Sequence, residues 1–285
     1  LTGTDEHGQK VEKSALKANM DPQTFTDNVS TSFKKLASKL EINNTDFIRT
    51  TEDRHIKSVK HLWNILVNKG DIYIDKYSGW YSIRDEAFYS NDEIIEDKNG
   101  KKLAPNGSEV EWLEEPSYFF KLSSWQDKLL KFYEKNPDFI SPKSRYNEVL
   151  SFVNGGLEDL SISRTTFNWG IQVPDNDDHV IYVWLDALTN YISALDYPNK
   201  DSKNWKSFWP ADIHVVGKDI LRFHAIYWPA FLMAAELEVP KKIYAHGWWT
   251  VDGKKMSKST GNVVSPDIII DKYGLDQFKY FLLRE

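Results

Sequence analysis

Apolar positions along the first 70 residues follow helical spacing in long segments and form short runs between them. The helical spacing predicts helices over residues 9–20, 21–40 and 52–69. Asp21 and Pro22 are typical of a helix start, and Gly70 is typical of a helix end. The short runs predict the end of a strand at residues 1–4 and a strand over residues 45–51. This succession of strands and helices predicts a parallel α/β layer.

The pattern changes after Gly70. Residues 71–122 alternate between apolar and polar positions over short, turn-rich segments, which is typical of an antiparallel insertion. Two helices then lead back towards the sheet, over residues 123–136 and 141–156. Residues 179–247 restore the α/β order, and a further helical segment begins at residue 266.

These elements predict an α/β protein with a Rossmann-like parallel sheet and helices on both of its faces. A small mixed subdomain without zinc interrupts that sheet. The two parts of the sheet domain are expected at residues 1–70 and 161–250, with the insertion at 71–160. Residues 251–285 hold a lysine-rich loop and the start of a helical region.

Composition narrows the class of protein. No apolar run approaches ~18 residues, so no membrane-spanning helix or membrane partner is expected. A net charge of −6 argues against a chain that coats nucleic acid without specificity. The chain has no cysteine, which excludes disulfides and thiolate metal sites and favours a cytoplasmic location. The opening LTGTDEHG has neither a methionine nor a signal peptide, so we expect a piece of a longer protein.

The loop DGKKMSKSTGN, residues 252–262, interleaves three lysines with three hydroxyl residues. Gly253 and Gly261 flank Lys255 and Lys258, so the backbone can approach a ligand closely. The ammonium groups could then converge on phosphate oxygens. The alternative is a solvated, charged turn, and residue types alone leave both interpretations open.

A second candidate site lies in GKDILRFHAIYWPAFL, residues 217–232. Gly217 follows a predicted strand, and Asp219 could accept hydrogen bonds from ribose hydroxyls at the start of the helix. His224 and Trp228 are four residues apart and would share one helix face. Together with Trp184 they could form an aromatic pocket for a thioether, although a lone histidine on such a face is often part of a core.

Four stretches carry a family resemblance. KMSKS resembles, letter for letter, the signature loop of class I aminoacyl-tRNA synthetases. TGTDEHG, YVWLDALTNYI and VGKDILRFHAIYWPA are similar to segments of the methionyl-tRNA synthetase family, and the similarity continues through the insertion. The resemblance implies a ligase that activates L-methionine with Mg²⁺-ATP to methionyl-adenylate and transfers the methionyl group to tRNA(Met).

The resemblance also implies roles for individual residues. Lys255 and Lys258 would stabilise the charge that develops on the phosphates, as catalytic residues. ATP would be bound by Gly217, Asp219, His246, Gly247, Trp249, Lys255, Met256, Ser257, Lys258 and Ser259. Methionine would be bound by Asp5, His7, Arg164, Trp184, Tyr191, His224 and Trp228, with Asp5 on the α-ammonium group.

Two departures from the family pattern matter. Many members hold zinc in the insertion through cysteines, but here Ser82 and Asp85 stand at the matching places, so we expect no metal. The insertion would be held instead by aromatic residues, namely Trp80, Tyr81, Phe88 and Trp112. The family's His-x-Gly-His turn is expected before residue 1 and its anticodon-binding domain after residue 285. This chain alone would then be incomplete for activity, with most tRNA contacts in the missing portion.

Two other functions stay open. A synthetase for leucine, isoleucine or valine would need a separate editing domain, because one methylene gives only ~1–3 kcal/mol of discrimination. An insertion over residues 71–160 is too small to be one. The other alternative is a non-catalytic, synthetase-like module that binds tRNA or a protein. The KMSKS loop and Asp219 argue against that alternative.

Overall fold

Parallel strands form the layer on which the site is built. In one group, β1 (Thr2–Thr4) pairs with β2 (Phe47–Arg49). In the other, β13 (His214–Gly217) pairs with β14 (Ile243–His246), which pairs with β8 (Ile140–Ser141). The computed structural model describes the whole chain except residues 86, 90, 99, 252–253, 257–262 and 285. The α/β class predicted from the sequence is confirmed.

The N-terminal helices follow the predicted boundaries. They are α1 (Gln9–Lys17), α2 (Pro22–Lys39) and α3 (Asp53–Asn68). The Asp21 carboxylate accepts a hydrogen bond of 2.9 Å from the backbone N–H of Thr24, so it caps α2 as expected. After α3 the backbone of Gly70 adopts φ +73°, a conformation that favours glycine, and the chain turns into the insertion.

Helix α6 (Val183–Ser193) packs against α3 in the centre of the core. Leu62 and Trp63 of α3 and Leu185 and Leu188 of α6 are buried. Each such side chain stabilises the fold by about 1.5–3 kcal/mol relative to exposure to water. The core continues into a π-helical turn (Phe223–Tyr227) and into α8 (Trp228–Ala234). This packing fixes the positions of the helices that border the site.

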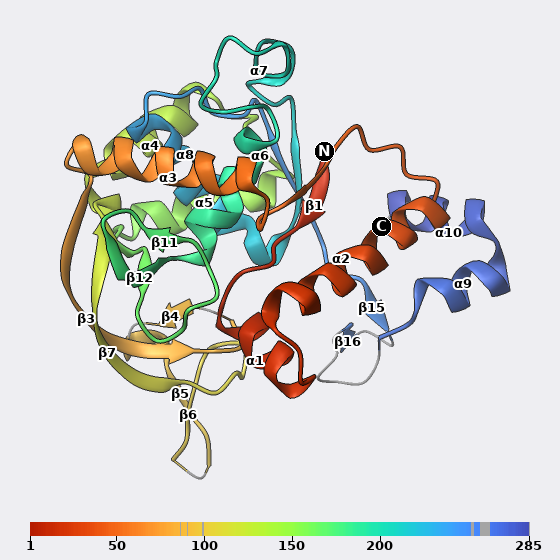
Figure 1. Ribbon diagram of the computed structural model, residues 1–285, viewed down its shortest axis with the longest axis horizontal. Coiled ribbons are helices and arrows are strands. Elements are labelled where there is room, and N and C mark those ends of the chain that lie inside the picture. Colours follow the sequence, from red (N-terminus) through yellow and green to blue (C-terminus); the bar gives the residue numbers. More distant parts are fainter. Residues whose placement is uncertain (86, 90, 99, 252–253, 257–262, 285) are drawn as a thin grey trace.

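The insertion is an antiparallel sheet with the order β4-β3-β7-β9. Its strands are β4 (Ala87–Tyr89), β3 (Ile72–Ser82), β7 (Glu111–Phe120) and β9 (Leu160–Ser161). The antiparallel arrangement was predicted, but the prediction that all of the strands are short was wrong. β3 and β7 contain 11 and 10 residues, and they pair along almost their whole length as a long curved ribbon (Figure 1).

Two segments pair differently from the predicted order. Strand β8 lies within residues 71–160, yet it belongs to the parallel sheet. Strand β12 (Asn176–Ile181) was expected in the parallel layer, but it pairs antiparallel with β10 (Ser163–Arg164) and β11 (Gln172–Val173). The reason is the tight turn at Asp175, where φ is +62°, because so short a connection joins only antiparallel strands. The division into four parts stays a prediction.

The remaining elements connect these layers. The helical ones are η1 (Asn91–Glu93), η2 (Leu122–Trp125), α4 (Gln126–Lys135), α5 (Lys143–Asn154), α7 (Lys203–Phe208), η3 (Lys218–Ile220), α9 (Pro266–Tyr273) and α10 (Leu275–Arg284). The strands are β5 (Ile95–Glu96), β6 (Lys102–Leu103), β15 (Thr250–Val251) and β16 (Lys254–Lys255). The predicted C-terminal helices are therefore present, and ion pairs from Lys39 to Asp267 and from Lys279 to Glu41 link them to α2 and the turn after it. None of the helices in the described ranges has the length and apolar character needed to cross a membrane.

Hydrogen bonds cross-link the tip of the insertion. The Asp85 carboxylate accepts from the hydroxyls of Ser82 at 2.9 Å, of Tyr89 at 3.1 Å and of Ser108. Burial raises the pKa of Asp85, but these hydrogen bonds outweigh it, so the pKa lies below its ordinary value. Across the part of the chain that the structure describes, no three His, Cys, Asp or Glu side chains are grouped to hold a metal ion. The Asp85 carboxylate thus connects segments 26 residues apart in sequence, from Ser82 to Ser108.

The aromatic residues expected to hold the insertion contribute only in part. Trp80 and Trp112 meet edge to face with ring centroids 5.3 Å apart, and Tyr81 is buried. The Phe88 backbone pairs with that of Tyr81, and its side chain lies outside the described part of the structure.

Replacing Asp85 with Ala is expected to lower the free energy of unfolding by about 1–3 kcal/mol, because three hydroxyl groups lose their acceptor. Urea denaturation of the complete protein that carries these residues measures this change. The control is Glu109→Gln, because Glu109 is 73% exposed in its ion pair with Lys101 and should contribute little.

The same experiment with a chelator separates the hydrogen-bond cluster from a metal site. EDTA should leave the unfolding curve of the unsubstituted protein unchanged. One zinc ion per chain by elemental analysis, together with destabilisation by EDTA, would contradict the prediction.

Candidate active site

A cavity of about 1170 Å³ lies along β1 and the first half of β13, and it reaches the loop and the turn that follow the carboxyl ends of these strands. The loop after β1, helix α6 and the turn after β13 all contribute to its walls. Five of its lining residues carry most of the chemistry, namely Asp5, Trp184, Tyr191, His214 and His224. Ligands of open α/β sheets bind at this end of the strands, because the loops that follow neighbouring strands converge there.

Helix α6 supplies the aromatic wall. Trp184, Leu188 and Tyr191 are spaced four and three residues apart, so they lie on one helix face and line the cavity. The Trp184 ring stacks on Phe223, with centroids 3.6 Å apart and an angle of 7° between the planes. This stacking fixes the orientation of the indole. Phe223 was not identified from the sequence, where it was one of many aromatic residues.

Tyr191 and His224 form a neutral, hydrogen-bonded pair. The Nδ1 atom of His224 lies 2.9 Å from the carbonyl oxygen of Ile220, and Nε2 lies 2.8 Å from the Tyr191 hydroxyl. A carbonyl only accepts, so Nδ1 carries the proton and Nε2 accepts from Tyr191. Burial lowers the pKa of His224 to about 4 and raises the pKa of Tyr191. Both side chains are therefore uncharged at neutral pH.

Trp228 does not share the cavity with His224 as predicted. Its side chain is 0% exposed, and it packs with Tyr191 and with Trp209 at centroid distances of 6.3 and 6.4 Å. The prediction assumed α-helical spacing, but residues 223–227 form a π-helical turn that places positions four apart in different directions. Trp228 supports the aromatic wall from behind.

His214 joins the wall and was missed in the sequence analysis. Its ring stacks on Tyr191 at 3.8 Å, with an interplanar angle of 19°. Burial, with a smaller contribution from nearby His224, lowers the pKa of His214 to about 3. The sequence signal that could have identified His214 as an inward-facing residue is the alternation in Ile213–Val216. In this segment His214 and Val216 are buried, whereas Ile213 and Val215 are exposed.

The loop after β1 presents Asp5 and buries its neighbours. Asp5 is exposed and lines the cavity, whereas Glu6 and His7 are buried. Glu6 accepts two hydrogen bonds from the Arg49 guanidinium, at 2.8 and 2.9 Å. His7 Nδ1 lies 2.6 Å from an oxygen of Asp186. Burial lowers the pKa of His7, but attraction to Asp186 outweighs it, so the pKa is raised. His7 thus points into the protein and is not among the residues that line the cavity, although it was expected to bind methionine.

Arg164 is buried and is not among the residues that line the cavity. Its side chain is 2% exposed, and its guanidinium is 4.5 Å from the Tyr182 ring and 5.5 Å from the Tyr81 ring. It donates to Ser161 Oγ at 2.8 Å and to the carbonyl of Ser163 at 2.6 Å. These contacts place the guanidinium among the rings of Tyr81 and Tyr182, and its predicted role beside Asp5 stays a prediction.

The predicted nucleotide residues meet at the ends of β13 and β14. Strand register places Gly217 opposite His246. A side chain at Gly217 would meet Asp219 at 2.8 Å, so glycine keeps this approach open. Asp219 is exposed and accepts a hydrogen bond of 3.2 Å from Trp248 Nε1, a residue not identified from the sequence. None of them is among the residues that line the cavity, so they form a separate group at the ends of β13 and β14.

The loop that follows is described in part. His246 stacks on Trp249 at a centroid distance of 6.2 Å and contacts the carbonyl of Gly247. The N–H of Met256 donates to the Trp249 carbonyl at 3.1 Å, and the Lys255 backbone pairs with Thr250. The predicted residues Ser257, Lys258 and Ser259 lie outside the described residues, as does the Lys255 side chain.

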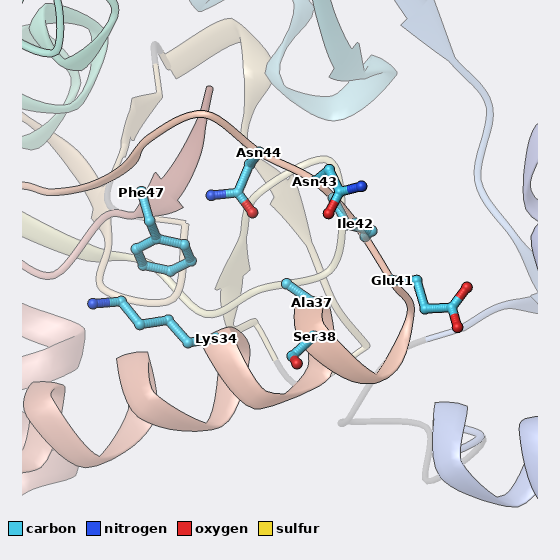
Figure 2. Close-up of a pocket in the computed structure, with 8 residues that line it drawn as sticks. All are labelled: Lys34, Ala37, Ser38, Glu41, Ile42, Asn43, Asn44 and Phe47. Carbon is cyan, nitrogen blue, oxygen red and sulfur yellow. The ribbon is translucent and has the colours of Figure 1, made fainter.

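A second hollow, of about 500 Å³, lies between the end of α2 and β2 (Figure 2). It is lined by Lys34, Ala37, Ser38, Glu41, Ile42, Asn43, Asn44 and Phe47. Lys34 Nζ lies 4.9 Å from the centroid of the Phe47 ring. None of the predicted site residues contributes to this lining, so the larger cavity is the candidate active site.

Comparison with known proteins decides the family. Residues 1–285 match the family described as tRNA synthetases class I (M). The chain belongs to this family. It is 64% identical over its whole length to a methionine–tRNA ligase of Rickettsia typhi and 54% identical to one of Brucella suis. The chain spans about half of these relatives, 55% of each.

Solved structures of the family superimpose closely on this chain. A crystal structure of Mycobacterium tuberculosis methionyl-tRNA synthetase bound by methionyl-adenylate has a TM-score of 0.95 and 51% identity. That match covers 99% of this chain and 55% of the other. The free form of the same synthetase has a TM-score of 0.81 over 92% of this chain and 51% of the other, at 48% identity. The class I (M) synthetase fold inferred from the sequence is confirmed.

Replacing His214 with Phe is expected to make the protein more resistant to acid. The folded pKa values of His214 and His224, about 3 and about 4, lie below the ordinary value of 6.5. The unfolded chain therefore takes up protons first, and stability is lost as pH falls below 6.5. Each histidine contributes about 1.4 kcal/mol per pH unit in this range.

The measurement is urea denaturation from about pH 7 to about pH 4, where phenylalanine should keep the stacking on Tyr191 but remove one titration. The stability difference between the variant and the original protein should grow steadily in favour of the variant as pH falls. Curves that stay parallel would show that His214 does not titrate with a lowered pKa.

Proposed function

We propose that the complete protein is a methionine–tRNA ligase. It activates L-methionine with ATP to methionyl-adenylate and transfers the methionyl group to tRNA(Met). The observation that carries this proposal is the uncharged aromatic wall of Trp184, Tyr191 and His224 in a cavity with a carboxylate, Asp5, on another wall. The similarity to a synthetase solved with methionyl-adenylate supports it.

The wall suits a thioether better than a charged or strongly polar side chain. A sulfur atom gains about 0.3–1.5 kcal/mol from each aromatic ring that it contacts. The tautomer of His224 matters here, because its unprotonated Nε2 accepts a hydrogen bond from the Tyr191 hydroxyl. Neither side chain therefore presents a charge to the ligand. We assign methionine binding to Trp184, Tyr191 and His224, and binding of its α-ammonium group to Asp5.

ATP is assigned to the ends of β13 and β14, outside the described lining of the cavity. Gly217 allows close approach, Asp219 would accept from the ribose hydroxyls, and His246, Gly247 and Trp249 would flank the base. Met256 to Ser259 and Lys255 would close over the phosphates. Mg²⁺ is expected to enter with the phosphates, since the described residues include no protein cage for a metal and Mg²⁺ binds nucleotides largely through phosphate oxygens.

The reaction needs little covalent work from side chains. A methionine carboxylate oxygen attacks the α-phosphorus of ATP, a phosphorus–oxygen bond forms, and the bond to pyrophosphate breaks. A terminal ribose hydroxyl of tRNA then attacks the methionyl carbonyl, and AMP leaves. Catalysis therefore rests on holding the carboxylate in line and on stabilising the charge on the phosphates.

The proposal assigns a role to each part of the chain. Residues 1–70 and 161–250 would form the catalytic domain, 71–160 the connective insertion, and 251–285 the loop and the start of the helical region. Most tRNA affinity would lie in portions of the complete protein beyond this chain.

Methionine-dependent exchange of pyrophosphate into ATP tests the function directly. The complete protein should catalyse exchange with L-methionine at a rate at least ~100-fold above the rate with leucine, isoleucine or valine. The side chains of these three amino acids lack the sulfur atom that gains from contact with the aromatic wall. A protein that binds tRNA but shows no exchange with any amino acid would support the non-catalytic alternative.

Replacing Lys258 with Ala in the complete protein is expected to slow adenylate formation roughly 100–1,000-fold, the usual effect of losing one preorganised group that meets transition-state charge. The dissociation constant of methionine should hardly change, because the interaction grows only as pyrophosphate departs. Rapid-quench measurement of adenylate formation checks this. A rate within threefold of the original would mean that the loop is only a solvated turn.

Trp184→Ala is the matched counterpart in the aromatic wall of the cavity. It should weaken methionine binding far more than ATP binding, because the indole contributes to the aromatic wall. Equal weakening of both substrates would contradict the assignment of separate sites to them.

A further inference from the structure

One buried carboxylate joins the loop after β1 to the helices behind it. Asp186 is 0% exposed and has a histidine on each oxygen. Its Oδ2 lies 2.6 Å from His7 Nδ1, and its Oδ1 lies 2.7 Å from His55 Nε2. The described lining of the cavity includes none of these three residues. Burying a carboxylate is unfavourable unless it is hydrogen-bonded, so the arrangement of its partners accounts for its position.

The first partner belongs to the loop that presents Asp5. His7 is two residues from Asp5, and the residues around it are also held. The Trp169 indole donates to the carbonyl of Glu6 at 2.6 Å, and the N–H of Gly8 donates to the carbonyl of Trp169 at 3.0 Å. Of residues 5–8, all of them described, Asp5 alone is exposed. Its backbone is therefore positioned by contacts that its neighbours make.

The other end of the link belongs to the aromatic wall. Asp186 lies on α6 between Trp184 and Tyr191, the two residues of that helix assigned to methionine. His55 of α3 holds Asp186 from the opposite side and contacts Ser193 Oγ at 2.9 Å, near the end of α6. A displacement of the Asp186 side chain would thus move the loop relative to the wall.

We propose that Asp186 is a positioning residue for methionine. Through His7 it holds Asp5 at a fixed place relative to Trp184 and Tyr191, so that the ammonium group and the thioether of one substrate are recognised together. This inference rests on the proposed function and adds to it a residue that touches neither substrate. Such preorganisation favours binding because the loop need not be ordered when the ligand arrives.

A purely structural role for Asp186 makes a different prediction. Loss of a buried partner would then lower stability and weaken all ligands of the cavity alike. A positioning role weakens only ligands with an α-ammonium group. The useful pair is L-methionine and 4-(methylthio)butanoate, which keeps the thioether and the carboxylate and lacks the amino group.

The test is Asp186→Asn in the complete protein, with both dissociation constants measured by titration or competition. L-Methionine should bind roughly tenfold more weakly, the effect of losing about one charge-assisted hydrogen bond. The butanoate should bind as before, within about twofold by the same reasoning. In an Asp5→Asn background, Asp186→Asn should have almost no further effect on methionine, because residues that act through one another are not additive.

Two more variants keep the result interpretable. Ser193→Ala removes the far contact of His55 and should leave both dissociation constants unchanged. His7→Asn breaks the link while Asp186 keeps His55, and it should repeat the selective loss of methionine binding.

Each remaining outcome overturns one claim. Equal weakening of both ligands, no weakening, or additive effects with Asp5→Asn would refute the positioning role of Asp186. Unfolding of both Asp186→Asn and His7→Asn, with Ser193→Ala folded, would show that the network serves stability alone. If the unsubstituted protein does not bind L-methionine, the proposed function itself fails.

Discussion

The burial of the Asp186 carboxylate is the constraint on which the site depends. A carboxylate with no exposed surface needs hydrogen-bond donors, and its two donors come from distant segments, His7 after β1 and His55 in α3. Removing one partner of a buried charged pair typically destabilises a protein by about 3–5 kcal/mol. The loop after β1, α3 and α6 must therefore be assembled together, and the cavity that opens between the loop and α6 has a defined shape.

The residues that line the cavity include a group of uncharged aromatic side chains and the carboxylate of Asp5. Burial keeps His214 and His224 neutral, and the hydroxyl of Tyr191 is engaged with His224. Asp5, by contrast, is exposed and lines the cavity. Under the proposed function, the aromatic wall would distinguish amino-acid side chains, and ATP would bind separately at the ends of β13 and β14.

Helix α2 shows what could be predicted from the sequence. Its apolar residues follow helical spacing and Asp21 caps its start, so the position of the helix could be predicted. It did not predict side-chain direction. His7 stands in a matching motif but points inwards to Asp186, and Trp228 is displaced by a π-helical turn that leaves no mark in the spacing of residues. Contacts between distant segments were also out of reach, such as the acceptor that Asp85 provides for Ser108.

The most direct test of the central claim, a methionine site between Asp5 and the α6 wall, is a crystal structure of the complete protein with L-selenomethionine. The selenium atom gives an anomalous signal that locates the side chain without interpretation of weak density. The account predicts a single peak within about 5 Å of the Trp184 and Tyr191 rings, the usual distance of such an atom from an aromatic ring. It also predicts that the amino group lies next to Asp5. A peak outside this cavity, or none at saturating ligand, would contradict the account.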